Sequence, residues 1–285
     1  MEDIMSAVEY SSKAAQPYLI NVGDADKMRA AALNLIFDPH SIDFFPFDKI
    51  KSSDKILFAG CGNGQLVVEI AKEIRKRNLN VEIVAFDIAQ PQLDCARKYA
   101  EQEGIDDINW KLQDVRNLEE FTGRFDVVHA RFLLNHLFDA EVVTKLLCDT
   151  LSADGIFIGE EFSGDDVDVL PANPEYTEAV NEWVKGVRLQ HTIQKSDMAF
   201  AKRLPDILRA NRMVITKENQ PNPIASNTEQ KNVFPECMAN AHRILPPEQH
   251  YTIPIIRAAL EHVRDSEECS ITFKHFTQVE ARKAA

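Results

Sequence analysis

The sequence has little cysteine, and what it has is not paired. Five cysteines are spread over 285 residues, an odd number with no Cys-x-x-Cys pair. This scatter argues against a disulfide framework and against a zinc site, so we expect free thiols in a reducing cytoplasm and no bound metal. The five are Cys61, Cys95, Cys148, Cys237 and Cys269.

Long apolar runs and basic clusters are missing as well. No stretch reaches the roughly 18 apolar residues of a membrane span. The first six residues, Met-Glu-Asp-Ile-Met-Ser, lack the basic start and apolar core of a secretory signal. Only 32 Lys and Arg face 45 Asp and Glu, which gives a net charge of −13. Such a surface repels phosphate backbones, so nucleic acid is not an expected partner.

What the chain does have is an alternation of strands and helices from residue 54 onward. Near-continuous apolar strands separated by helices predict a parallel sheet covered on both faces. Right-handed crossovers then make the α/β fold doubly wound, with ligands at the carboxyl ends of the strands. The expected strands cover residues 55–59, 82–86, 109–112, 125–130 and 155–159, and the expected helices 65–77, 90–103 and 141–151.

Further segments surround this core and complete a mostly parallel, seven-stranded sheet. We expect an N-terminal helical cap over residues 1–40 and a sheet domain over 41–285, with helical insertions near 170–200 and 227–265 that cap the pocket. The added helices are expected at 2–10, 25–37, 175–191, 197–210, 228–244 and 247–264, a loop at 219–226, and the last strands at 213–217 and 270–281.

A glycine-rich loop follows the first expected strand. Gly60, Gly62 and Gly64 allow a tight turn, so that a ligand can lie against bare main chain at a helix N-terminus. A dinucleotide fingerprint would need glycine where Gln65 stands, and the Lys-Ser/Thr pair of a P-loop is absent. The next strand ends in Asp87, whose carboxylate can accept hydrogen bonds from both hydroxyls of a ribose or cap the following helix.

The ordered series of motifs resembles the class I S-adenosylmethionine-dependent methyltransferases, of the small-molecule type akin to the quinone-biosynthesis methylases. The similarity runs from about Tyr18 to the end of the chain. The matching segments are Ile56-Leu57-Phe58-Ala59-Gly60-Cys61-Gly62-Asn63-Gly64, Ala85-Phe86-Asp87-Ile88-Ala89-Gln90-Pro91-Gln92-Leu93, Leu112-Gln113-Asp114-Val115, Phe125-Asp126-Val127-Val128-His129-Ala130-Arg131-Phe132 and Ala201-Lys202-Arg203-Leu204-Pro205-Asp206-Ile207-Leu208.

The resemblance implies S-adenosyl-L-methionine as cofactor. Asp114 would meet the adenine amino group, Ala130 and Arg131 would touch the cofactor through their main chain, and an N-terminal tyrosine would close over it or act as an aromatic staple. The residues implied are Tyr18, Gly60, Cys61, Gly62, Gly64, Asp87, Ile88, Gln92, Asp114, Val115, Ala130 and Arg131.

One position departs from the pattern. The family usually carries Asp or Glu where this chain has Phe58, and that carboxylate helps to hold the methionine end of the cofactor. Phenylalanine cannot accept from the methionine ammonium. Losing a charge-assisted hydrogen bond costs about 1.5–3 kcal/mol, or on the order of ten- to a hundredfold in affinity.

Candidate catalytic residues lie at the tips of the fourth and fifth expected strands. Methyl transfer from a sulfonium is an in-line displacement, and a base is needed only if the acceptor must lose a proton. His136 is the first candidate, as a base or as an orienting group. His129 is the second, unless it is a buried, satisfied histidine. Glu161, beside Glu160, is the third, unless it caps nearby amides.

A pocket for the acceptor and the overall function complete the expectations. Five apolar positions could line the pocket or pack as core: Trp183, Val187, Phe234, Met238 and Ile244. The leading hypothesis is methylation of oxygen or nitrogen on a small ring compound. Methylation of a protein side chain is one alternative. Another is a binding or regulatory module whose cofactor site has decayed, which the phenylalanine at position 58 suggests. The oligomeric state, a homodimer included, stays open.

Overall fold

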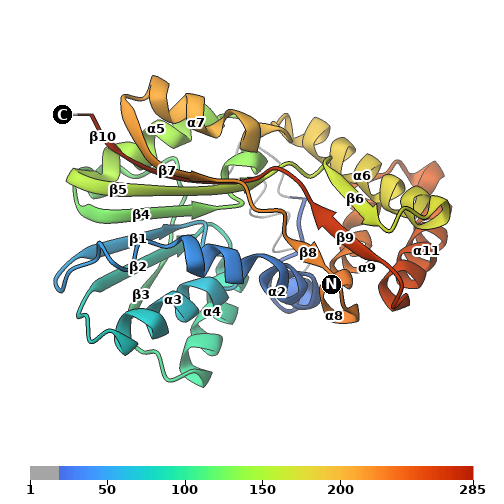
Figure 1. Cartoon of the computed structure of the whole chain (residues 1–285), viewed down its shortest axis with the longest axis horizontal. Helices are drawn as coiled ribbons and strands as arrows, with labels where there is room; N and C mark the ends of the chain where they lie inside the picture. Colours follow the sequence, from blue (N-terminus) through green and yellow to red (C-terminus); the bar gives the residue numbers. More distant parts are fainter. Residues whose placement is uncertain (1–18, 285) are drawn as a thin grey trace.

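The computed structural model describes residues 19–284, and its elements are labelled in Figure 1. The expected helix at 2–10 and Tyr18 lie outside the described residues. Within this range, no helix is both long and apolar enough to cross a membrane.

Seven strands form the main sheet, in the order β3-β2-β1-β4-β5-β10-β7. Six of them run in the same direction, and β10 alone runs antiparallel, between β5 and β7. This confirms the predicted doubly wound, mostly parallel sheet. The strands are β1 (Lys55–Ala59), β2 (Glu82–Asp87), β3 (Ile108–Leu112), β4 (Phe125–Arg131), β5 (Leu151–Phe162), β7 (Met213–Asn219) and β10 (Phe276–Lys283).

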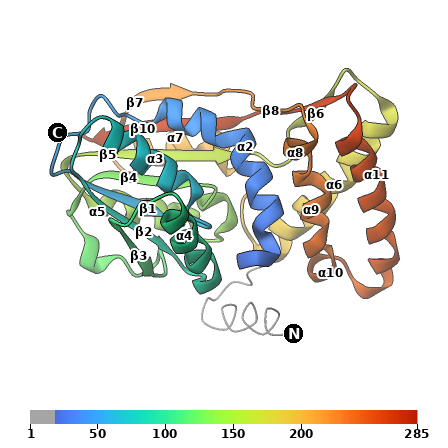
Figure 2. The same cartoon turned by 90° about the horizontal axis from the view of Figure 1, so that it is seen from below.

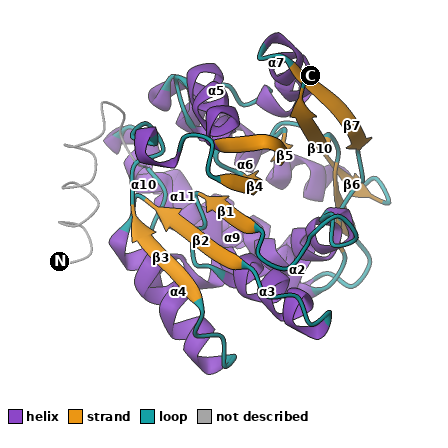
Figure 3. Cartoon of the chain, turned by 90° about the vertical axis from the view of Figure 1, so that its left-hand side faces the viewer, coloured by secondary structure: helices purple, strands orange, loops and turns teal. Residues whose placement is uncertain are grey.

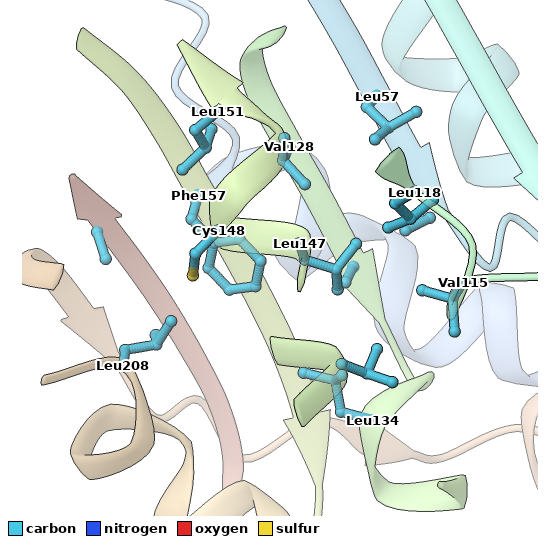
Figure 4. Packing of buried hydrophobic residues seen from close by; sticks show 14 of the residues in the cluster. Leu57, Val115, Leu118, Val128, Leu134, Leu147, Cys148, Leu151, Phe157 and Leu208 are labelled. Atoms are coloured by element: carbon cyan, nitrogen blue, oxygen red, sulfur yellow. The ribbon is translucent and has the colours of Figure 1, made fainter. Parts of the chain in front are cut away.

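Helices cover both faces of this sheet, as Figure 3 shows end-on. Parallel strands need such cover because both of their faces are apolar. On one face, α3 (Gln65–Lys76) and α4 (Gln90–Gln102) pack beside the last turn of α2 (Lys27–Phe44). On the other, α5 (Ala140–Thr150) and α7 (Phe200–Ala210) enclose the cluster drawn in Figure 4.

A second, smaller unit lies beside the carboxyl end of the sheet (Figure 2). It has a three-stranded sheet in the order β6-β9-β8, which the sequence analysis did not predict. Phe37 of α2 packs in its core while Phe44 packs under the main sheet, so α2 connects the two units. The elements are β6 (Val167–Leu170), α6 (Pro174–Gln194), β8 (Ile224–Ala225), α8 (Thr228–Lys231), α9 (Val233–Cys237), α10 (Ala241–Ile244), α11 (Ile253–Asp265) and β9 (Ser270–Phe273).

Several expected boundaries were wrong. The helix expected at 25–37 runs from Lys27 to Phe44, and the one expected at 247–264 starts as a 3-10 helix (Pro247–Thr252) before α11. The strand expected at 155–159 begins at Leu151, where a helix was expected to end. The strand expected at 270–281 is two strands in different sheets, because His275 between them has a φ of 51° and turns the chain. The helix expected at 228–244 is broken into short helices, and the loop at 219–226 contains β8.

Candidate active site

One cavity of about 560 Å³ lies between the carboxyl edge of the main sheet and the smaller unit. Its floor consists of the loop after β1, the ends of β2 and β4, and the loop after β3. Its roof consists of α2, α6 and the chain between α9 and α11. The cavity therefore lies where ligands bind in open α/β sheets.

The glycine loop presents bare backbone to this cavity at Gly62. With a φ of +55°, a side chain there would meet no heavy atom within 4 Å, so the space above it is open to a ligand. Gly64 is needed for a different reason. A Cβ at that position, where φ is +73°, would lie 2.5 Å from the Cβ of Ala96 and 2.8 Å from the Trp110 ring. Loop and helix α4 thus pack too closely for any side chain.

Asp87 is tied to the glycine loop. Its Oδ2 accepts a hydrogen bond from the Gly62 N–H at 2.9 Å, and its Oδ1 accepts one from the Ala89 N–H at 2.9 Å. Burial raises the pKa of the Asp87 carboxyl, while these backbone donors act to lower it. The carboxylate therefore both shapes the loop and lines the cavity beside Gly62.

The structure brings most of the residues predicted for the cofactor together around this cavity. Those that line it are Gly60, Cys61, Gly62, Asp87, Ile88, Gln92, Asp114, Val115 and Arg131. Gly64 and Ala130 do not line it: Gly64 packs on α4, and the Ala130 side chain is buried in the cluster on the α5 side of the sheet.

A buried polar cluster joins β4, β5 and α2 next to the loop. His129 Nε2 lies 2.6 Å from Glu160 Oε1. The other carboxylate oxygen of Glu160 accepts from Ser41 Oγ at 2.8 Å and from Gln278 Nε2 at 2.7 Å. Burial acts to raise the pKa of Glu160, but the hydrogen bond to His129 and the charge of Arg131 outweigh it and hold the pKa below its usual value. His129 lines the cavity and Glu160 lies behind it.

Arg131 completes this cluster. Its guanidinium lies 2.7 Å from Asp38 Oδ1 and donates to Ser41 Oγ at 3.0 Å and to Asn34 Oδ1 at 3.3 Å. Burial raises the pKa of Asp38 against the opposing effect of Arg131. The three α2 residues are spaced so that they share one buried face of that helix, a polar stripe that the sequence analysis missed.

Two histidines stack in the part of the cavity under the roof. The rings of His136 and His191 are 5.6 Å apart and nearly parallel, and both line the cavity. Burial lowers the pKa of His136 to about 3, helped by His191 and Arg29, and lowers the pKa of His191 to about 4. Both imidazoles are therefore uncharged at neutral pH. His191 Nδ1 lies 2.8 Å from Ser196 Oγ, which fixes the ring.

Glu161 does not line the cavity, contrary to expectation. It is fully buried, and its Oε1 accepts from the N–H groups of Leu133 and Leu134 at 3.0 and 2.7 Å. Its Oε2 has no hydrogen-bond partner among residues 19–284. Burial raises the pKa of Glu161 to about 8, so the group is mostly protonated at neutral pH. It holds the turn that carries His136, which agrees with the alternative interpretation of an acid that caps amides.

The roof contains most of the predicted pocket residues. Phe234 is the exception, since it is fully buried behind Trp183, with ring centroids 5.0 Å apart. The residues that do line the cavity are Trp183, Val187, Met238 and Ile244. Two buried amides, Asn135 and Asn240, also line the cavity and were not predicted; each has an Oδ1 with no partner among the described residues.

The fold and the site together define a nucleoside-binding α/β domain: a doubly wound sheet, a bare glycine loop and a carboxylate at the tip of the next strand. The comparison with protein families makes this specific. A family model described as a methyltransferase domain matches residues 50–227. The chain therefore belongs to the methyltransferase-domain family, which confirms the resemblance found in the sequence.

Similar proteins agree with this family. The chain is 29% identical over 102 residues to a ubiquinone biosynthesis O-methyltransferase from Acinetobacter baylyi, a match covering 35% of this chain and 40% of that protein. The chain thus spans less than half the length of this curated relative. Two solved structures share the fold. The YcgJ protein from Bacillus subtilis has a TM-score of 0.55 at 13% identity, covering 87% of this chain and 100% of that one. A SAM-dependent methyltransferase from Thiobacillus denitrificans, in complex with S-adenosyl-L-homocysteine, has a TM-score of 0.51 at 12% identity, covering 93% and 100%.

Proposed function

We propose that this protein transfers a methyl group from S-adenosyl-L-methionine to a small-molecule acceptor held under the helical roof. The single observation that carries the proposal is the continuous cavity, which runs from the glycine loop to the stacked histidines. Family membership supplies the class of reaction. The enzyme is thus a methyltransferase whose cofactor and acceptor share one cavity.

The residues around the loop fit this cofactor. The open space above Gly62 admits a ligand against the backbone, and Asp87 beside it offers carboxylate oxygens to a ribose. Asp114 and Val115 line the same cavity on the β3 side, which supports their assignment to the adenine ring. When bound, the cofactor supplies an activated methyl carbon on a sulfonium. The protein's part is to position the acceptor in line with that carbon and to exclude water.

The acceptor end of the cavity is apolar with a few amides and imidazoles. Trp183, Met238 and Ile244 give apolar walls, while Asn135 and Asn240 add amide side chains to the lining. Amides and uncharged imidazoles in the lining favour a ligand that carries hydrogen-bonding groups of its own. We therefore assign a ring compound that carries hydroxyl or amino groups as the acceptor class.

His136 orients the acceptor rather than storing its proton. With a pKa of about 3, this buried imidazole is a weak proton acceptor but can still accept a hydrogen bond. The reacting atom is then an amine nitrogen in its free-base form or an already ionised phenol oxygen, both of which attack without giving a proton to the protein. Glu161 acts by positioning, because it holds the turn of His136 from beneath.

Methyl transfer from labelled cofactor tests the proposal. The full chain is incubated with S-adenosyl-L-methionine carrying a labelled methyl group and a set of hydroxylated and aminated ring compounds, or with cell lysate, and the products are separated by size. Label in small molecules is the expected result. Label in proteins would support the alternative of a protein methyltransferase, and no transfer despite tight cofactor binding would support a decayed binding module.

A further inference from the structure

The strand order sets the direction in which the cofactor crosses the site. Asp114 follows β3, Asp87 ends β2, the glycine loop follows β1, and β4 is the next strand along the sheet edge. A ligand with its base near Asp114 and its ribose on Asp87 therefore extends past the loop to β4. Its amino-acid end arrives at the cavity wall formed by His129.

The groups found at that wall suit a cation. Behind His129 lies Glu160, a carboxylate with 0% exposure, and the surrounding cluster holds two carboxylates, Asp38 and Glu160, against one guanidinium, Arg131. Burying a carboxylate is costly unless it is hydrogen-bonded and paired. The contact with Glu160 uses His129 Nε2, so Nδ1 is the ring nitrogen outside that contact, and His129 itself lines the cavity.

We infer that His129, oriented by Glu160, binds the amino group at the amino-acid end of the cofactor, an inference that rests on the proposed function. In the tautomer that donates Nε2–H to Glu160, the Nδ1 lone pair accepts a hydrogen bond from the ammonium. The buried negative charge of Glu160 then stabilises the ammonium through the ring. Glu160 is thus a positioning residue, and His129 is the residue in contact with the ligand.

Phe58 supports this assignment. It pairs in register with His129 across β1 and β4, and the two rings lie 5.3 Å apart. The apolar ring at position 58 offers no acceptor to an ammonium, and the imidazole on the adjacent strand does. The carboxylate that the resemblance leads one to expect on β1 is thus replaced by a carboxylate two strands away, on β5, acting through an imidazole on β4.

Two ligands that differ only at the amino-acid end test the inference. S-adenosyl-L-homocysteine has the ammonium and carboxylate, and 5′-deoxy-5′-methylthioadenosine has the same nucleoside and thioether without them. Their binding to the full chain is measured by isothermal titration calorimetry for the wild type and for His129→Gln, whose amide can still donate to Glu160. The matched control is Glu280→Gln. Glu280 is also a buried carboxylate, 1% exposed and 2.7 Å from Lys49 Nζ, but it lies outside the cavity.

The expected result is selective. His129→Gln weakens S-adenosyl-L-homocysteine binding by about 10- to 100-fold, the value of a charge-assisted hydrogen bond, and leaves the methylthioadenosine affinity within about twofold. Glu160→Gln should likewise weaken S-adenosyl-L-homocysteine binding and leave the methylthioadenosine affinity nearly unchanged. This second variant tests the inference if His129→Gln does not fold. Glu280→Gln changes neither affinity.

Two results would overturn the inference. One is an unchanged affinity for S-adenosyl-L-homocysteine in both His129→Gln and Glu160→Gln. The other is an equal loss of affinity for the two ligands, which would mean that His129 contacts the nucleoside or has a structural role. A wild-type chain that binds neither ligand would instead overturn the proposed function, and this inference with it.

Discussion

Replacing Glu161 by glutamine tests the electrostatics beneath the active-site turn. The glutamine amide has the shape of the protonated carboxyl, and its carbonyl oxygen can still accept from Leu133 and Leu134. Burial raises the pKa of Glu161 from 4.5 to about 8. Between these values the folded state keeps a proton that the unfolded state releases, so the wild type loses stability as pH rises. At about 1.4 kcal/mol for each pKa unit, the full penalty above pH 8 is about 5 kcal/mol.

The glutamine side chain of the variant has no ionisable proton, so the variant does not show this loss of stability with rising pH. We expect the free energy of unfolding of the wild type, relative to Glu161→Gln, to fall by about 3 to 4 kcal/mol between pH 5 and pH 8. Urea unfolding followed by tryptophan fluorescence measures the difference at each pH. The exposed Glu178→Gln is the control and should show no such trend.

Two results would refute this reasoning. A wild-type-to-variant difference that is constant with pH would mean that Glu161 titrates normally. A loss of turnover of more than about 100-fold at pH 7 would show that Glu161 acts as a general base, against its placement outside the cavity.

The remaining predictions concern the loop and the acceptor end. Gly64→Ala forces a Cβ to 2.5 Å from the Ala96 Cβ, so it should lower the melting temperature by several degrees, which differential scanning calorimetry detects. In Gly62→Ala the new methyl group meets no protein atom, so the free energy of unfolding should fall by only about 1–2 kcal/mol because of the positive φ. The affinity for S-adenosyl-L-homocysteine should fall as well, because the methyl group occupies the space of the ligand. An unchanged affinity would show that no ligand approaches Gly62. Asp87→Ala should weaken the same ligand by at least about tenfold in a calorimetric titration, and an unchanged affinity would indicate a decayed site. Because the pKa of His136 is about 3, the pH profile of wild-type turnover should show no step from this histidine between pH 5 and pH 8. A step in that range that is absent from the profile of His136→Gln would contradict this.

The sheet was predictable because its strands are encoded locally. Each parallel strand is a short apolar run with polar ends, and each crossover helix has its own apolar stripe. The loop could also be predicted from sequence, since Gly62 and Gly64 are required by the local backbone and by one helix contact. These signals need only a few neighbouring residues.

The smaller unit was not predictable in the same way. Residues 270–281 resemble one strand because the apolar pattern continues, and only the positive φ of His275 separates β9 from β10. The partner strands β6 and β8 are four and two residues long, too short to give a period. Their pairing depends on tertiary contacts that no local pattern records.

The polar parts of the site were only partly visible. His191 was overlooked although it follows Trp183 by eight residues on α6, so both fall near one face of the helix. Asn34 and Asp38 on α2 carried a similar signal, since polar residues four apart face the same way. Sequence alone does not show that such a stripe is buried, because an exposed polar face has the same spacing.

Titration of the full chain with S-adenosyl-L-homocysteine is the most direct test of the cofactor site at Gly62 and Asp87. The account predicts one molecule bound for each chain, with a dissociation constant on the order of 1–100 µM, or about −5 to −8 kcal/mol. No heat of binding at millimolar ligand, from a chain that unfolds cooperatively, would contradict it.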